Sequence, residues 1–293
     1  MEPLAGTLVV DFTRYLPGPF ASRELLERGA RVVRVQAPGG DPMRDVAPGW
    51  HEALNAGKES VAWDLDREPE LGRALSAQAD VVLEGFRPGV AERLGIGPRD
   101  LPGSVVYCSI TGFGPDDLRA GHDLNYQGWA GILADTAPAL PPVQVADLAG
   151  GALYAVVEIL SALLERERSG RGRHINVSMT HNAHRLAEHR LHGEAERMLT
   201  GALACYRIYE TADGRYLTIT PVEPRFWLRL CELIGRQDLV ERQYEEDQEA
   251  LAAELATVFH GRRLADWLEL FDGEDVMAGP VATLAEARTS FGG

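Results

Sequence analysis

Residues 7–35 read TLVVDFTRYLPGPFASRELLERGARVVRV, and this stretch decides the fold. A short run of β-forming residues, 7–11, is followed by Pro17 and a segment of helical length that ends before Gly29. Proline is favoured in the first turn of a helix, and glycine is favoured just after the last turn. A second apolar run, 31–35, comes next. The stretch therefore predicts one strand–helix–strand unit.

The same alternation continues to residue 178. Further strands are expected at 60–63, 79–84, 105–110 and 174–178, and helices are expected at 68–77 and 150–168. Strands separated by segments of helical length are typical of βαβ units and a parallel sheet. The GxGxxG fingerprint of dinucleotide sites does not follow the first strand. We predict a large α/β domain with a Rossmann-like parallel sheet over residues 1–179.

Beyond residue 179 the composition changes, and residues 180–203 are predicted to be a helical linker. This segment has few β-forming residues and contains four histidines spaced i, i+3, i+8 and i+11, so that they lie roughly on one helix face: His181, His184, His189 and His192. A metal site is one interpretation. We favour a solvated or interface face, because no carboxylate-rich segment accompanies the histidines.

The C-terminal third predicts a second, smaller α+β domain over residues 204–293. Asp213-Gly214 lies between two apolar runs, which is a strong signal for a β-hairpin. Amphipathic helices are expected near 224–235, 246–259 and 262–271.

The composition disfavours several classes of protein. A net charge of −15 argues against nucleic-acid binding, which needs a basic face. No run of about 18 apolar residues and no basic leader is visible, so we expect neither a membrane span nor export. Three cysteines without a CxxC pair favour reduced thiols in the cytoplasm and argue against a zinc site. Lys58 is the single lysine, which reflects either compositional bias or a lysine that faces a phosphate ligand.

Three acidic positions and one histidine are candidates for chemistry. Asp123 is expected to be the N-cap of a helix, with His122 at the helix start, where backbone N–H groups can stabilise an oxyanion. Asp147 precedes the helix expected at 150–168, and Glu223 follows the hairpin. Each acid also has a simpler interpretation as a helix-capping residue.

Several segments, in this order, point to one family. Segments 55–61, 80–89 and 109–114 read NAGKESV, DVVLEGFRPG and SITGFG. Together with the opening 4–35, they resemble the class III CoA-transferase (CaiB/BaiF) family, which includes the α-methylacyl-CoA racemases. The resemblance extends from Leu4 to about Leu284.

Three features resemble the racemases more than the transferases of this family. Residues 121–126 read GHDLNY, and 223–226 read EPRF, as in the racemases. Transferases tend to carry a glycine-rich loop in the small domain, and the sequence between Gly214 and Gly279 has no glycine cluster.

The resemblance implies the inversion of 2-methylacyl-CoA thioesters through an enolate. In that mechanism His122 and Asp147 are the two bases, Glu223 orients or charges His122, and backbone N–H groups around Asp123 stabilise the enolate. Two acid/base groups flanking the α-carbon suit this chemistry, because a proton must leave one face and return to the other. A cofactor is not required, because the thioester itself acidifies the α-proton. The CoA phosphates are expected to bind cations, and the resemblance points to three: Arg34, Lys58 and Arg87.

Two other functions stay open. In a CoA-transferase, Asp147 would be the nucleophile that forms an acyl anhydride. A CoA-binding protein without catalysis is the third possibility.

The resemblance also implies a homodimer, in which subunits of the relatives interlock and the active site combines domains of both. Relatives continue with a C-terminal arm past the segment that matches 276–284, whereas this sequence ends at Gly293. Arg173-His174 also departs from the family, which often has Gln and an apolar residue there.

Overall fold

The computed structural model describes residues 2–191 and 198–291, which divide into two compact units, Met1–Glu188 and His189–Gly293. The division falls inside the segment that we predicted to be a linker. Helix α8 (Met179–Leu186) belongs to the first unit, where it packs against helices of that unit. Residues 192–197 of the predicted linker lie outside the described residues.

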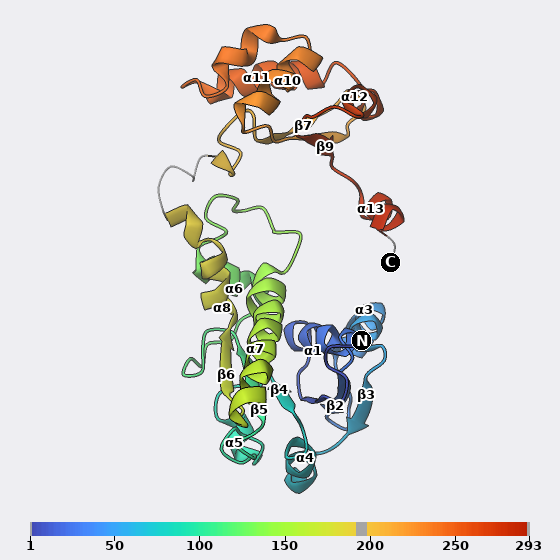
Figure 1. Ribbon diagram of the computed structural model, residues 1–293, viewed down its shortest axis with the longest axis vertical. Coiled ribbons are helices and arrows are strands. Elements are labelled where there is room, and N and C mark those ends of the chain that lie inside the picture. Colours follow the sequence, from blue (N-terminus) through green and yellow to red (C-terminus); the bar gives the residue numbers. More distant parts are fainter. Residues whose placement is uncertain (1, 192–197, 292–293) are drawn as a thin grey trace. The chain divides into compact units, whose positions relative to one another are not determined.

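The first unit contains a six-stranded parallel sheet with the order β3-β2-β1-β4-β5-β6 (Figure 1). The predicted α/β class with a parallel, Rossmann-like sheet is confirmed. Every strand lies within about two residues of its predicted position. Runs of Val, Ile and Leu mark the central strands, which are buried on both faces. The strands are β1 (Leu8–Asp11), β2 (Arg31–Gln36), β3 (Glu59–Ala62), β4 (Val81–Glu84), β5 (Val106–Thr111) and β6 (His174–Ser178).

Helices and 3₁₀ or π turns connect the strands of the first unit. The helices of the first unit are α1 (Pro17–Glu27), α2 (Met43–Val46), α3 (Pro48–Asn55), α4 (Pro69–Ser76), α5 (Val90–Arg93), α6 (Asp123–Ala130), η1 (Ala146–Leu153), α7 (Tyr154–Ser169) and α8, and η2 (Glu188–Leu191) spans the boundary to the second unit. Gly29 follows α1 with a φ of +96°, a left-handed conformation that glycine adopts without strain.

Both faces of the central strands are buried, each against a separate hydrophobic core. One face packs against α1, α6, α7 and α8, with residues such as Val9, Leu25, Cys108 and Ile159 in the core. The other face packs against α5 and its flanking loops, with Val10, Val82 and Ile96 in the core. Burial of this apolar surface, at roughly 25 cal/mol per Å², is the main force that holds the sheet and helices together.

The segment Ala146–Ser169 is long and apolar enough to cross a membrane by length and composition. Within the first unit it packs against α1, β5 and β6, as the core helix of an α/β domain does. The expectation that the chain does not span a membrane stays a prediction.

The second unit contains an antiparallel sheet with the order β7-β8-β9 and a layer of helices. The hairpin predicted at Asp213-Gly214 joins β7 to β8, and Gly214 has a φ of +68°. The third strand and the last helix are additions to the predicted set. The elements are β7 (Arg207–Glu210), β8 (Tyr216–Ile219), α10 (Pro224–Leu233), η3 (Gln237–Arg242), α11 (Gln248–Phe259), α12 (Leu264–Phe271), β9 (Ala278–Pro280) and α13 (Leu284–Phe291).

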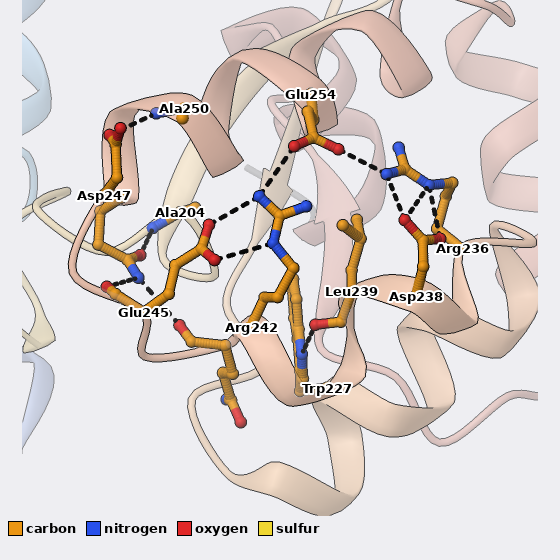
Figure 2. A network of polar contacts seen from close by, with 12 residues as sticks. Ala204, Trp227, Arg236, Asp238, Leu239, Arg242, Glu245, Asp247, Ala250 and Glu254 are labelled. Atoms are coloured by element: carbon orange, nitrogen blue, oxygen red, sulfur yellow. Dashed lines mark hydrogen bonds and ion pairs between the residues drawn. The ribbon is translucent and has the colours of Figure 1, made fainter.

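A network of charged side chains joins η3 to α11 in the second unit (Figure 2). Glu254 accepts from Arg236 at 2.5 Å and from Arg242 at 2.8 Å, and Asp238 and Glu245 complete the pairs. Such partly exposed ion pairs contribute little singly, typically about 0–1 kcal/mol each. Because Glu254 of α11 pairs with both arginines, the network holds η3 against α11. It thereby orients η3 over the core that contains Trp227 and Leu239.

Candidate active site in the first unit

A pocket of about 770 Å³ lies at the carboxyl ends of the strands in the first unit. The loops that follow β1, β4 and β5 form its walls, through residues such as Thr13, Arg87 and Arg119. In the order β3-β2-β1-β4-β5-β6, the connections change direction between β1 and β4. Open α/β sheets bind ligands at such a switch point. The topology alone therefore favours this pocket as the functional site.

His122 and Asp147 both line this pocket, as does Arg87. The three residues are far apart in the sequence and come from three different segments. The structure thus brings together the two residues predicted to be bases and one cation predicted to bind CoA. It does so within a single unit.

His122 is the N-cap of α6, and Asp123 is the first residue of the helix. The prediction that Asp123 is the N-cap was therefore wrong by one residue. The cause is Asn125, whose side-chain oxygen accepts the His122 backbone N–H at 3.0 Å and so completes a capping box around His122. The exposed His122 side chain lies at the start of the helix, beside the N–H groups of Asp123 and Leu124, for which the described part of the chain shows no hydrogen-bond acceptor.

Asp123 points into the protein, where it is 8% exposed. One carboxylate oxygen accepts the backbone N–H of Asp147 at 2.9 Å, and the other accepts the side-chain amide of Gln127. Asp123 therefore holds the backbone that carries Asp147. The backbone role predicted for its N–H group, stabilisation of an enolate, stays a prediction.

Asp147 lies in the first turn of the π-helix η1, which continues directly into α7. The helix therefore begins four residues earlier than predicted, and Asp147 is inside it rather than before it. Gly150 explains the close packing of this turn, because a Cβ there would be 2.8 Å from the Met179 carbonyl oxygen of α8. Wide π turns are often found at functional sites, where they redirect a side chain.

The Asp147 carboxyl has a pKa raised to about 7, first because it is partly buried and second because Asp123 is negatively charged nearby. Burial and a like charge both disfavour the ionised form of a carboxyl group. At neutral pH, Asp147 is therefore able both to donate and to accept a proton. Imidazoles ordinarily titrate in the same range, so such a carboxyl suits an imidazole partner in proton transfer.

Arg87 lies on the loop that follows β4 and is exposed. Within residues 2–191 and 198–291 its side chain has no ion pair or hydrogen bond. The loop is held from below by Glu84, whose carboxylate accepts the Phe86 N–H at 2.7 Å. Burial raises the pKa of Glu84 to about 7. Arg87 is thus an unpaired cation on an anchored loop.

The side chains of Arg34 and Lys58, the other two predicted CoA-binding cations, are buried in the first unit. Arg34 is 1% exposed and forms an ion pair with Asp41 and a contact with His51 at 3.1 Å. The Lys58 ammonium group donates to the Pro19 carbonyl at 2.8 Å, and burial lowers its pKa to about 8. In this arrangement both cations have partners within the fold.

Glu223 belongs to the second unit, where it is the exposed N-cap of α10. Proline at the first helical position follows it, as the sequence predicts for a helix start. Its predicted role beside His122 stays a prediction.

The pocket also contains polar residues that the sequence analysis did not single out. Arg119 lies between two aromatic rings, 4.1 Å from the centroid of Phe113 and 4.4 Å from that of Trp129. Its guanidinium group also pairs with Asp117 at 2.7 Å. The sequence analysis also missed Gln127, which lies behind the pocket and donates to Asp123, although its place four residues after Asp123 puts both residues on one helix face.

The four linker histidines do not share one helix. Helix α8 ends at Leu186, and η2 is a separate 3₁₀ turn, so the predicted common face is interrupted. His181 pairs with the Ser178 hydroxyl at 2.8 Å, and His184 with the Ala130 carbonyl at 3.0 Å. His192 lies outside the described residues. Within the described part of the chain, no group of three His, Cys, Asp or Glu residues is placed to hold a metal ion.

The sequence model of the family described as CoA-transferase family III matches residues 4–291. The chain belongs to CoA-transferase family III. Its members include enzymes with two kinds of reaction. The sequence is 33% identical to an alpha-methylacyl-CoA racemase of Mus musculus, over 97% of this chain and 79% of the relative. It is 31% identical to a succinyl-CoA:glutarate CoA-transferase of Mus musculus, over 98% of this chain and 73% of the relative.

Solved structures of this CoA-transferase family agree with the fold. The crystal structure of Rv3272 from Mycobacterium tuberculosis has a TM-score of 0.84 and 32% identity, and it covers 98% of this chain and 85% of that chain. The crystal structure of a CAIB/BAIF family protein from Brucella suis has a TM-score of 0.81 and 30% identity. The match covers 98% of this chain and 86% of the Brucella suis chain. This family III member is therefore an enzyme that handles CoA thioesters.

Proposed function

We propose that this enzyme is a racemase of 2-methylacyl-CoA thioesters. His122 and Asp147 remove the α-proton from one face and return a proton to the other. The observation that carries the proposal is the Asp147 carboxyl group, which shares the pocket with His122 and has a pKa of about 7. A two-base mechanism needs each base to exist in both protonation states at the working pH.

The enolate formed between the two steps carries negative charge on its oxygen. The first turn of α6 directs the N–H groups of Asp123 and Leu124, which have no acceptor in the described part of the chain, toward the end of the helix beside His122. Preorganised backbone donors of this kind stabilise an oxyanion without the cost of reorganisation. No cofactor enters this mechanism, because the thioester carbonyl accepts the electron pair released by C–H cleavage. That absence is part of the proposal.

CoA transfer is the second candidate, since the transferases match the chain about as closely as the racemases do. Its nucleophile would be Asp147. The raised pKa of Asp147 favours proton transfer over nucleophilic attack, because a carboxyl near its pKa is partly protonated and the protonated form is not nucleophilic. Binding without catalysis has less support, since the relatives that match nearly the whole chain are enzymes.

We expect incubation of either enantiomer of a 2-methylacyl-CoA in deuterated water to introduce deuterium at the α-carbon and to yield both enantiomers. Mass spectrometry and chiral chromatography of the released acid measure the two results. Acetate or another added carboxylate should not be needed. Transfer of CoA to the added carboxylate, without deuterium at the α-carbon, would establish the transferase reaction in place of racemisation.

A homodimer also belongs to the proposal. Leu153, Val157 and Leu164 are 45%, 59% and 60% exposed within the chain and lie on one face of the helix that runs through η1 and α7. Apolar surface of this kind on a helix face is a common dimer contact, and a second copy is the simplest partner.

Light scattering is expected to give twice the chain mass of 32.0 kDa. Val157→Glu combined with Leu164→Glu should shift the protein toward monomer, because two charges would be buried in the contact. Leu71→Glu, on α4, is the matched control and should leave the dimer intact. A monomeric unaltered protein would contradict the proposal.

A further inference from the structure

The side-chain amide of Gln127 is buried beside the two carboxyl groups of the candidate site. Gln127 is 2% exposed and follows Asp123 by one turn of α6. Its Nε2 atom donates to Oδ2 of Asp123, and the backbone N–H of Asp147 donates to Oδ1. Both oxygens of Asp123 therefore have a hydrogen-bond donor. A buried amide rarely occupies such a position unless its hydrogen bonds are satisfied.

Asp147 has a different environment from Asp123. Its side chain lines the pocket, and in the described part of the chain no hydrogen bond to its carboxyl group is present. When two carboxyl groups lie close together in a partly buried site, the first proton that binds is shared by the pair. The surroundings of each group decide which of the two carries this proton. Donors directed at one group stabilise the charge on that group and leave the proton on the other.

We propose that Gln127 is a positioning residue that fixes the negative charge on Asp123 and thereby leaves the proton of the carboxyl pair on Asp147. The inference rests on the proposed function in one respect, since it assumes that proton transfer at Asp147 is what the reaction uses. Gln127 itself does not touch the substrate in this proposal. It acts through Asp123, which separates it from the pocket.

Other charged groups near Asp147 do not replace this effect. Helices α1 and α8 also pack against η1. On α1, Arg23 pairs with Glu27 and Glu24 pairs with Arg28. On α8, Arg185 lies over the Tyr154 ring, and the two histidines have the Ser178 and Ala130 partners described above. The Tyr126 hydroxyl donates to the Gly121 carbonyl at 2.5 Å. The charged and titratable side chains that line the pocket with Asp147 are Arg14, Tyr15, Arg87, Asp117, Arg119, His122 and Tyr126. Asp123 is the charge that raises the pKa of Asp147.

The direct test is a titration of the two carboxyl groups by NMR, with ¹³C-labelled aspartate. Asp147→Asn and Asp123→Asn assign the two signals by their loss. In the unaltered protein, the step near pH 7 should be seen at Asp147 alone. In Gln127→Met, which keeps the length of the side chain but removes the donor, the same step should be divided between Asp147 and Asp123. An unchanged step at Asp147 would overturn the proposal.

A double-mutant cycle gives a kinetic form of the test. Gln127→Met should lower kcat for α-proton exchange by about tenfold, the equivalent of one pKa unit, with little change in KM. In the Asp123→Asn background the same replacement should have almost no further effect, because the charge through which Gln127 acts is gone. An equal loss in both backgrounds would mean that Gln127 contributes only to packing. Gln78→Met, at a surface position where the amide bonds the Ala74 carbonyl, is the matched control.

A measurement on the unaltered protein protects the test against variants that do not fold. The side-chain amide protons of Gln127 should keep their resonance positions through the step near pH 7, because that step belongs to Asp147. Movement of these protons with the step near pH 7 would refute the proposal. If α-proton exchange is absent, the proposed function fails, and the NMR titration alone decides the role of Gln127.

Discussion

Replacing His122 by alanine or Asp147 by asparagine is expected to abolish most of the α-proton exchange, with a loss of about 10²–10⁴-fold in kcat for each variant. Each variant removes one of two groups that must act on opposite faces of the α-carbon. Both groups line the same pocket in the first unit, and neither lies in its hydrophobic core. The rate of deuterium incorporation from deuterated water, measured by mass spectrometry at saturating acyl-CoA, gives the loss directly.

The two variants should differ in a way that identifies the reaction. In a two-base racemase, a single remaining base can still exchange the proton on its own face, so each variant should retain weak exchange for one enantiomer of the substrate. Opposite enantiomers should survive in His122→Ala and in Asp147→Asn. In a transferase, Asp147→Asn should lose the transfer of CoA, whereas His122→Ala should lose much less. Equal residual exchange of both enantiomers in both variants would argue against two bases on opposite faces.

The pH dependence of α-proton exchange should also differ between the two enantiomers of the substrate. For one enantiomer, Asp147 is the base that removes the α-proton, and it must then be ionised. The rate of α-proton exchange of this enantiomer should therefore rise as the pH increases through about 7, the pKa of Asp147. For the other enantiomer, Asp147 is the acid that returns a proton, and it must then be protonated. The rate of inversion of this enantiomer should therefore fall over the same pH range. Asp123→Asn should move both transitions to lower pH, because it removes the charge that raises this pKa.

His181→Ala is the matched control for the histidine variant. His181 is a histidine at a helix start, and it pairs with Ser178 outside this pocket. Its replacement should leave the exchange rate within about twofold of the unaltered enzyme, as for surface substitutions away from the site.

The sheet could be predicted from the sequence because each strand and each turn is marked by residues within its own short segment. Val9-Val10 and Val81-Val82 mark strands that are buried on both faces, and Gly29 and Gly214 mark turns that need a positive φ. The positions of His122, Asp147 and Arg87 in one pocket then follow from topology, because the loops after parallel strands meet at one edge of the sheet. The resemblance to a known family supplied their suggested roles.

Features that depend on tertiary packing could not be predicted. Arg34 is a charged residue in a strand and by its residue type would be expected at an exposed position, but it pairs with Asp41, contacts His51 and is buried. Lys58 becomes internal because its ammonium group reaches the Pro19 carbonyl, a residue 39 positions away. Within the π-helix that carries Asp147, Gly150 lies so close to α8 that a Cβ there would be 2.8 Å from the Met179 carbonyl oxygen. None of these contacts leaves a periodic signal in the sequence.

Arg87→Ala is expected to raise the apparent KM for acyl-CoA by about 10- to 100-fold with a much smaller change in kcat. An arginine that contacts phosphate forms charge-assisted hydrogen bonds, which are roughly twice as strong as neutral ones. Arg87 is the predicted CoA-binding cation that the structure leaves exposed and unpaired in the described part of the chain, whereas Arg34 and Lys58 have internal partners. Loss of a contact equally present in the ground state and the transition state raises KM and leaves kcat unchanged.

The salt dependence separates a phosphate contact from a structural role of Arg87. If Arg87 binds phosphate, the KM of the unaltered enzyme should rise with ionic strength, because salt screens exposed charges over about 10 Å at 0.1 M. The KM of Arg87→Ala should depend less on salt. Arg93→Ala is the matched control. Arg93 lies on the following helix α5, does not line the pocket, and forms an ion pair with Asp66 at 2.5 Å. An unchanged KM in Arg87→Ala, or an equal salt dependence in both enzymes, would show that the CoA phosphates are bound by other groups. The buried Arg34 and Lys58 would then have to leave their partners on ligand binding. The next measurement would be the substitution of Asp41, which pairs with Arg34, or of Asn55, whose side-chain oxygen accepts from the Lys58 ammonium group at 3.1 Å.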